Sequence, residues 1–241
     1  MKLLGVVLLM LGLAVNAAAQ KVFEKDTLKT SGGPVVITCV GHGSLCLEWK
    51  DQIIHIDPFG RVADYSKLPK ADLILITHQH GDHLDPQAIG KITKEDTRIV
   101  CPEICRELVT NPFVMKNGDT LNISGIHILA VPAYNIQHKR DSGEPFHVKG
   151  AGNGYVLIFK DKKIYIAGDT EDIPEMADLK NIDIAFLPMN LPYTMSPEMV
   201  ASAVKMFYPK IVYPYHFGDT DTGKLVKLLK NEDVEVRVRN F

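Results

Sequence analysis

The stretch Thr77-His78-Gln79-His80-Gly81-Asp82-His83 indicates how the rest of this chain is organised. It holds three imidazoles and a carboxylate, and it directly follows the apolar run Ala71-Asp72-Leu73-Ile74-Leu75-Ile76. That run is short, rich in branched aliphatic residues and bounded by polar ones, which predicts a buried strand. The histidines are therefore expected to follow the end of a strand and to lie in the loop after it.

The spacing within this stretch favours metal binding. In an extended segment alternate side chains share a face, so His78 and His80 can bind one ion. Gly81 lets the backbone turn, and Asp82 and His83 can then point to a second position nearby. Neutral imidazole is the commonest nitrogen ligand of metals, and zinc accepts mixed His and Asp ligation. A loop that is rich in histidine by chance is the weaker interpretation, because such groups at a buried strand end need partners.

The bulk composition is that of an ordinary globular protein. The chain has 241 residues, of which 46% are hydrophobic and 23% charged, with a formal net charge of −2. That length can form one sizeable core or at most two small ones. A charge so close to neutral gives no basic surface for nucleic acid, so we expect a small-molecule substrate and no nucleic-acid partner. The oligomeric state is left open.

The first twenty residues have the pattern of a secretory signal peptide. Lys2 gives a positive start, an apolar run covers residues 3–15, and small residues follow at 17–19. The apolar run is shorter than the ~20 residues that a membrane span needs. We therefore predict cleavage near Ala19 or Gln20 and secretion across the inner membrane. The mature chain is expected in the periplasm, with no membrane contact after cleavage; an uncleaved N-terminal anchor is the alternative.

The cysteines are Cys39, Cys46, Cys101 and Cys105. An oxidising compartment would permit disulfides, and four cysteines allow three pairings. None belongs to a C-x-x-C pair, and Cys39 and Cys46 fall in apolar runs typical of strands. Small buried hydrophobic residues are the favoured interpretation, with one or more disulfides as the alternative.

The order of the expected elements predicts the architecture. Strands are expected over residues 34–40, 45–49, 53–58, 71–76, 97–101, within 113–133, and over 155–159, 163–167, 182–188, 211–215 and 234–238. Helices are expected over 86–92, 102–109, 197–207 and 223–229; Asp85 and Ser196 should cap two of them, each followed by a proline at the first helical position. Residues 21–30 are a linker or an edge strand, and 134–154 are an irregular loop. Strands followed by helices, twice over, predict two sheets face to face with helices outside, in a single domain over residues 21–241.

Two later segments add metal-competent side chains at strand ends. Asp169 lies in Gly168-Asp169-Thr170, and His216 ends Pro214-Tyr215-His216. Together with the T-H-x-H-x-D-H run, these motifs resemble the metallo-β-lactamase superfamily. More narrowly, the chain resembles the branch of metal-dependent hydrolases that includes ascorbate-6-phosphate lactonase. The resemblance extends from about Val35 to the C-terminus.

The resemblance implies an α/β (α+β) fold, a four-layer αββα sandwich with a dinuclear site at one edge. His78 and His80 would bind the first metal, and Asp82 and His83 the second. Asp169 would bridge both ions and His216 would complete the second site. Two divalent ions are implied, zinc first, with manganese or iron as alternatives, since His and Asp ligands suit all three.

The chain departs from the family pattern at the remaining ligand of the first metal. Relatives tend to have a histidine after an apolar-Pro-Ala-aromatic turn, whereas here Asn135 follows Val131-Pro132-Ala133-Tyr134. We favour His147, because it stands just before the glycine-rich start of the next strand. His138 and an amide or water ligand at Asn135 remain open.

The implied reaction is hydrolysis of an ester, lactone, amide or phosphodiester by a hydroxide generated between two metals. We assign catalysis to Asp82 and His83, with Asp82 able to pass a proton to the leaving group. The alternatives are a non-catalytic metal-binding protein and an iron oxidoreductase on the same fold. Such oxidoreductases often replace a metal histidine by a carboxylate, whereas His80 is intact.

Further residues have two interpretations each. Asp57 could orient a ligand imidazole or cap a turn before Pro58. His42 could line the mouth of the site, although a plain turn histidine is the favoured interpretation. Loop residues Tyr134, Tyr193 and Thr194 could contact substrate or simply pack.

Overall fold

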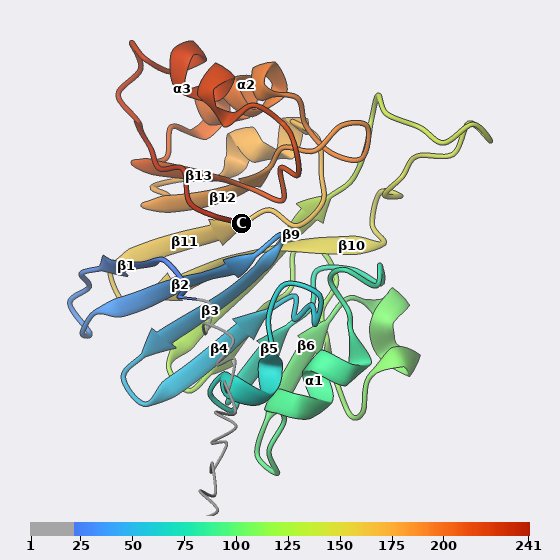
Figure 1. The fold of residues 1–241 in the computed structure, drawn as a ribbon, viewed down its shortest axis with the longest axis vertical. Helices are drawn as coiled ribbons and strands as arrows, with labels where there is room; N and C mark the ends of the chain where they lie inside the picture. The colour runs from blue at the N-terminus through green and yellow to red at the C-terminus, as the bar shows by residue number, and fades with distance from the viewer. Residues whose placement is uncertain (1–21) are drawn as a thin grey trace, which may run out of the picture.

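The computed structural model describes residues 22–241 and contains two β-sheets that lie face to face (Figure 1). The first sheet has the strand order β1 to β7: β1 Lys25–Leu28, β2 Val35–Gly41, β3 Ser44–Trp49, β4 Gln52–Ile56, β5 Leu73–Leu75, β6 Arg98–Cys101 and β7 Phe113–Val114. The second has the order β14 to β8: β14 Glu235–Val236, β13 Ile211–Tyr215, β12 Ile184–Pro188, β11 Lys162–Ile166, β10 Gly152–Phe159, β9 Ile126–Ala133 and β8 Thr120–Ile123.

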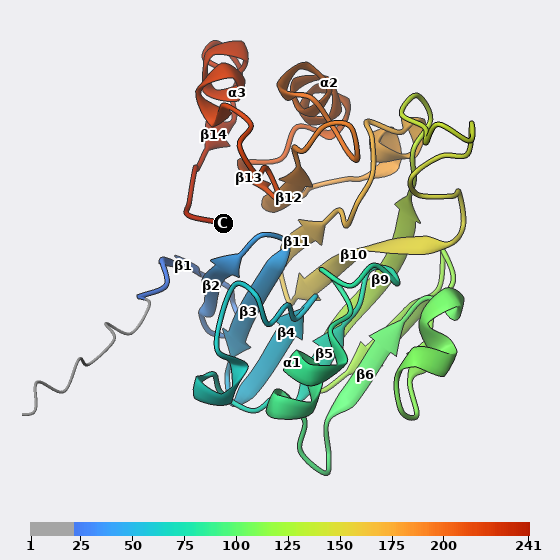
Figure 2. The same cartoon turned by 45° about the vertical axis from the view of Figure 1, so that its right-hand side comes forward.

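Helices cover the outer face of each sheet (Figures 1 and 2). Helix α1 (Pro86–Ile92) and the 3₁₀ segments η1 (Tyr65–Lys67) and η2 (Glu103–Leu108) pack on the first sheet. Helices α2 (Pro197–Phe207) and α3 (Thr222–Leu228) and the 3₁₀ segment η3 (Pro174–Asp178) pack on the second. The layers are therefore helix, sheet, sheet and helix, and the predicted sandwich is confirmed.

Three apolar clusters correspond to the three interfaces between these layers. The largest fills the space between the sheets, where the rings of Trp49 and Phe159 meet edge to face at 5.4 Å. The other two lie under the outer helices. Burying apolar side chains on both faces of each sheet is the main stabilising contribution, at about 25 cal/mol per Å². It also explains why the central strands are apolar almost throughout rather than alternating.

The structure confirms the two predicted helix caps and the predicted edge strand. The Asp85 side chain accepts from the backbone N–H groups of Gln87 and Ala88 at the start of α1. Ser196 accepts from the N–H of Met199 at the start of α2. Residues 25–28 form an edge strand that pairs antiparallel with β2, the second of the two interpretations given to that segment.

Some boundaries differ from the predicted ones. Residues 103–108 form 3₁₀ turns rather than a regular helix, and the last strand shrinks to Glu235–Val236. Strand β10 begins at Gly152, three residues before the predicted start, because residues 152–154 pair with β9. All four cysteines are buried and unpaired, which fits the interpretation as small hydrophobic residues.

The predicted signal peptide falls in residues 1–20, outside the described residues, so the division into a signal and one domain stays a prediction. Within residues 22–241, no helix has the length and apolar character that a membrane crossing requires.

Candidate metal centre

The polar residues singled out in the sequence meet at one edge of the sandwich. Thr77 to His83 follow β5, Asp169 follows β11, and His216 follows β13. Strands β4, β5 and β6 are parallel neighbours in one sheet, as are β11, β12 and β13 in the other. Carboxyl ends of parallel strands emerge at the same edge of a sheet, so both sheets present their loops to one place.

One set of side chains, the three-histidine group, consists of His78, His80 and His147. His80 Nδ1 lies 3.0 Å from His78 Nε2 and 3.3 Å from His147 Nε2. Nitrogens that share a tetrahedral zinc at ~2.0–2.1 Å are about 3.3 Å apart. The group therefore has the spacing that one ion requires, and it includes the favoured candidate His147 rather than His138.

A second set, the mixed group, consists of His42, Asp82, His83 and His216. Asp82 Oδ2 lies 3.7 Å from His83 Nε2, 3.4 Å from His216 Nε2 and 2.9 Å from His42 Nε2. His42 was expected to be a plain turn histidine, and its position beside Asp82 is a correction of that preference. The turn between β2 and β3 lies at the same edge of the sheet as the loop after β5, which the spacing of the motif does not reveal.

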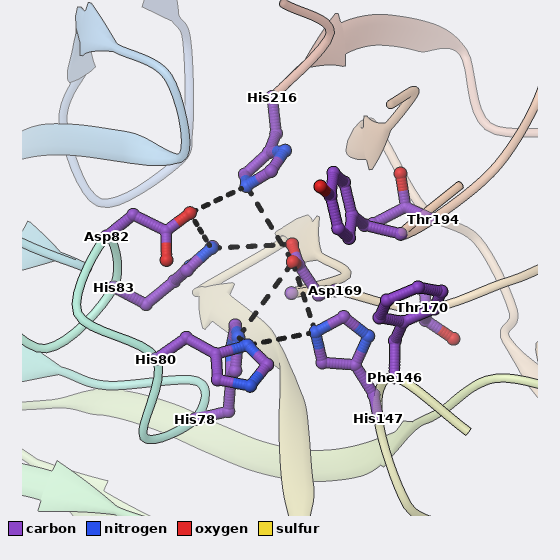
Figure 3. Close-up of polar contacts among 12 residues, drawn as sticks. His78, His80, Asp82, His83, Phe146, His147, Asp169, Thr170, Thr194 and His216 are labelled. Carbon is purple, nitrogen blue, oxygen red and sulfur yellow. Dashed lines mark hydrogen bonds and ion pairs between the residues drawn. The ribbon is translucent and has the colours of Figure 1, made fainter. Parts of the chain in front are cut away.

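Asp169 lies between the two groups (Figure 3). Its Oδ2 is 3.3 Å from His147 Nε2 and 3.8 Å from His78 Nε2. Its Oδ1 is 3.5 Å from His83 Nε2, and its Oδ2 is 3.7 Å from His216 Nε2. A carboxylate placed in this way can give one oxygen to each of two ions.

Asp57 orients His83 from behind. The carboxylate is fully buried; Oδ2 is 2.8 Å from His83 Nδ1 and accepts from the Thr77 hydroxyl at 2.6 Å. Oδ1 accepts from the Thr77 backbone N–H at 2.8 Å. With Nδ1 engaged, the other nitrogen of His83 faces the site, which is the usual arrangement behind a metal-binding imidazole. The geometry fits the orienting role rather than a turn cap.

Asn135 has the corresponding place behind His147. Its Oδ1 accepts from the backbone N–H of His147 at 2.9 Å and lies 2.7 Å from His147 Nδ1. Its amide donates to Glu171 Oε1 at 3.1 Å. Asn135 is therefore placed to orient the ring of His147 instead of replacing it.

Sequence reasoning missed Glu171, a fully buried carboxylate that holds the loop carrying His147. It accepts from the backbone N–H groups of Ile136, Gln137 and His138, each at 2.7 Å. These hydrogen bonds outweigh burial and lower its pKa. Its position two residues after Asp169 is the one signal that could have drawn attention to it.

The pKa shifts differ between the two groups. Burial and the neighbouring imidazoles hold the pKa of His78 well below its usual value, and burial lowers that of His80. Burial also lowers the pKa of His83, but Asp169, Asp57 and Asp82 outweigh it and raise that pKa to about 9. Burial raises the pKa of Asp169, yet the adjacent His216 and His83 bring it well below the usual range. The carboxylate of Asp169 is thus ionised and ready to accept cations.

The residues fit a metal on independent grounds. Within the described part of the chain, the buried atoms His83 Nε2 and Asp169 Oδ1 have no hydrogen-bond partner. Buried polar atoms without partners are costly, and a cation between these two would satisfy both. The donor set of imidazoles and carboxylates is the one that zinc, manganese and iron accept.

A cavity of about 380 Å³ opens over this edge. Its walls include the proposed ligands Asp82, Asp169 and His216 together with Arg140, Phe146 and Tyr193. Phe146 and Tyr193 meet edge to face at 5.1 Å. Of the loop residues suggested from sequence, Tyr193 borders the cavity, whereas Tyr134 and Thr194 are buried beside it and pack into the protein.

Comparison with known proteins agrees with the geometry. The family model described as "Beta-lactamase superfamily domain" matches residues 36–216. The chain belongs to the metallo-β-lactamase superfamily. A metal-dependent hydrolase of Methanopyrus kandleri is 33% identical over 199 residues, which cover 76% of this chain and 84% of that protein.

Solved structures of similar proteins show the same fold. A crystal structure from Parabacteroides distasonis, described as a metal-dependent hydrolase, is 50% identical, has a TM-score of 0.88, and covers 91% of this chain and 100% of that one. Igni18, a metallo hydrolase of Ignicoccus hospitalis, is 24% identical with a TM-score of 0.71, covers 86% of this chain and 95% of that one, and shows the fold alone. The expectation of an enzyme agrees with the names of these relatives.

Proposed function

We propose that this protein is an exported metal-dependent hydrolase of the periplasm that cleaves an ester, lactone, amide or phosphodiester bond in a small molecule. The observation that carries the proposal is the position of Asp169 between the three-histidine group and the mixed group. The signal-like pattern over residues 1–20 supports export.

The proposed ligands follow the two groups. His78, His80 and His147 would hold one divalent ion; Asp82, His83 and His216 would hold another, and Asp169 would serve both. Zinc is the first choice, with manganese or iron as alternatives. Such ions, when bound, would supply a water of lowered pKa and would polarise the oxygen of the scissile bond.

The remaining chemistry falls to the side chains around the cavity. Asp82 is the carboxylate of the site with the most solvent contact, its side chain being 35% exposed, so it can pass a proton to the departing group. Phe146 and Tyr193 would shield the bond from bulk water. The guanidinium of Arg140 borders the same cavity and can donate hydrogen bonds to a polar part of the substrate. No serine or cysteine nucleophile is required.

The test is to substitute the shared carboxylate and one histidine. Asp169→Ala and His80→Ala should each lose bound metal, measured by elemental analysis. Each should also lose about 10²–10³-fold in turnover on a panel of lactone, ester and phosphodiester substrates. His127→Ala, an exposed histidine of β9, is the matched control. Either variant with full metal content and full turnover would refute the proposed site.

Export can be tested separately, by cell fractionation and analysis of the N-terminus. The mature protein is expected in the periplasmic fraction with a new N-terminus near residue 20 or 21. An intact Met1 on protein recovered from the cytoplasm would contradict this part of the proposal.

A further inference from the structure

The turn Gly41-His42-Gly43-Ser44 between β2 and β3 is built against the mixed group. The backbone carbonyl of His42 accepts from the N–H of His216 at 3.0 Å, so this turn is joined to the loop after β13. His42 has a φ of 54°, and His216 has a φ of 50°. A positive φ is uncommon for residues other than glycine, and from this backbone conformation both imidazoles lie within 3.4 Å of Asp82 Oδ2.

Gly43 allows the turn to approach the site closely. A Cβ at this position would lie 2.9 Å from Cε1 of His83. The His83 ring cannot move aside, because Asp57 holds its Nδ1. Any larger residue would therefore push His42 away from Asp82.

The ring of His42 is also held in place from two sides. It lies 3.8 Å from the ring of His216 and 5.7 Å from that of Phe59, measured between centroids. Its Nε2 then ends 2.9 Å from Asp82 Oδ2, closer than the Nε2 atom of either His83 or His216.

From this geometry we propose that His42 is a direct ligand of the ion in the mixed group. The inference rests on the proposed metal centre and extends its ligand set. That ion would have four protein ligands of its own, His42, Asp82, His83 and His216, besides a share of Asp169. The ion in the three-histidine group would have three of its own and the same share. To bind through Nε2, the neutral imidazole of His42 has to carry its proton on Nδ1.

Two consequences follow from the unequal ligand sets. The mixed group, with the larger set and a carboxylate of its own, should bind the first ion that the protein takes up. Its higher ligand number would also let the mixed group accept manganese or iron, the alternatives to zinc, because these ions take up to six ligands.

The alternative role for His42 is to position Asp82 by a hydrogen bond, and two variants separate the roles. His42→Ala removes both the ligand and the hydrogen bond. His42→Gln keeps an N–H near the place of Nε2 but is a poor metal ligand. His127→Ala is the control, since that exposed histidine lies next to Asn122 on the second sheet.

The experiment is a cobalt(II) titration of chelator-treated protein, followed by visible absorption and calorimetry, with thermal melting as a check of folding. The wild type should take up two ions, with a weak absorption band for the first. Both His42 variants should bind that first ion at least about tenfold more weakly, with a more intense band as a ligand is lost. The control should match the wild type.

Each other result has a definite meaning. If His42→Gln keeps wild-type affinity and spectrum while His42→Ala does not, His42 positions Asp82 and the assignment as a ligand is overturned. If both variants match a wild type that binds two ions, it is also overturned, and the proposed function stands. A wild type that binds no cobalt, zinc or manganese would overturn the proposed function and this assignment together.

Discussion

The two halves of the metal centre are held in different ways. In the mixed group, His216 directly follows β13, and His83, in the loop after β5, is fixed by the buried carboxylate of Asp57. In the three-histidine group, His147 comes from the long loop before β10 and depends on Asn135 for its orientation. The sheet edge therefore preforms one half, whereas a polar network inside a loop completes the other.

The halves also differ in charge. His83 is surrounded by three carboxylates, which raise its pKa to about 9 in spite of burial. His78 is surrounded mainly by other imidazoles, which together with burial lower its pKa. In the mixed group a metal cation can therefore take the place of the proton on His83, whereas the low pKa of His78 keeps that ring neutral and ready to ligate.

The largest expected effect comes from breaking the support of the mixed group. Asp57→Asn keeps a side chain that tolerates the φ of 45° at this position but leaves an amide facing the donors of Thr77 and His83. Removing one partner of a buried pair costs about 3–5 kcal/mol. Urea unfolding of the chelator-treated protein should show a loss of this size, and the affinity for the first ion should fall by about 10–100-fold.

The exposed Asp178 supplies the control for this change, because Asp178→Asn removes the same charge from the surface of η3. If Asp57→Asn unfolds at the same urea concentration as Asp178→Asn, the carboxylate contributes nothing beyond its charge, and the contrast between the two halves disappears.

A smaller effect is expected in the pH dependence of the free energy of unfolding, which should differ between the two halves. In the metal-free protein, the raised pKa of His83 means that its protonated form stabilises the fold fully below pH 6.5, and this contribution is lost as the pH rises through about 9. The window is worth on the order of 3 kcal/mol. The depressed pKa of His78 has the opposite sign, because the fold keeps this ring neutral and loses stability as the pH falls below 6.5.

The measurement is the free energy of unfolding of wild type, His83→Gln and His78→Gln between pH 5.5 and 9.5 in the presence of a chelator. The difference between wild type and His83→Gln should shrink toward high pH. For His78→Gln the wild type should gain on the variant as the pH rises from 5.5 to 7. Differences that are constant across this range would show that neither ring titrates as the geometry indicates.

The sequence predicts the residues that follow β5 more securely than the rest of the metal centre, for a physical reason. His78, His80, Asp82 and His83 are placed by one strand end, and strands are readable from their apolar runs. The same reasoning places Asp169 and His216. The position of His42 depends on which turns share an edge of the sheet, which is a tertiary property.

The loop before β10 shows a second reason why the sequence alone does not predict the whole metal centre. Its local sequence offers His138, His147 and Asn135 without ranking them by distance from the site. Glu171, which is far along the chain, binds the backbone of residues 136–138 and thereby turns His138 away from the three-histidine group and His147 toward it. A loop conformation that depends on one buried carboxylate far along the chain cannot be predicted from the hydrophobic periodicity of the sequence.

The last prediction concerns this loop. Asn135→Ala removes the acceptor of His147 Nδ1 and the donor to Glu171, so the His147 ring loses its fixed orientation. Affinity for the second ion should fall by about tenfold, near the lower limit for residues behind a metal ligand, while affinity for the first ion stays unchanged. Asn122→Ala, at an exposed position on β8, is the control. Calorimetric titration of both ions distinguishes the outcomes. A loss of affinity confined to the first ion would show that Asn135 supports the mixed group instead of the three-histidine group. Equal losses of affinity for both ions would mean that the loop supports the whole edge of the sandwich rather than His147 alone.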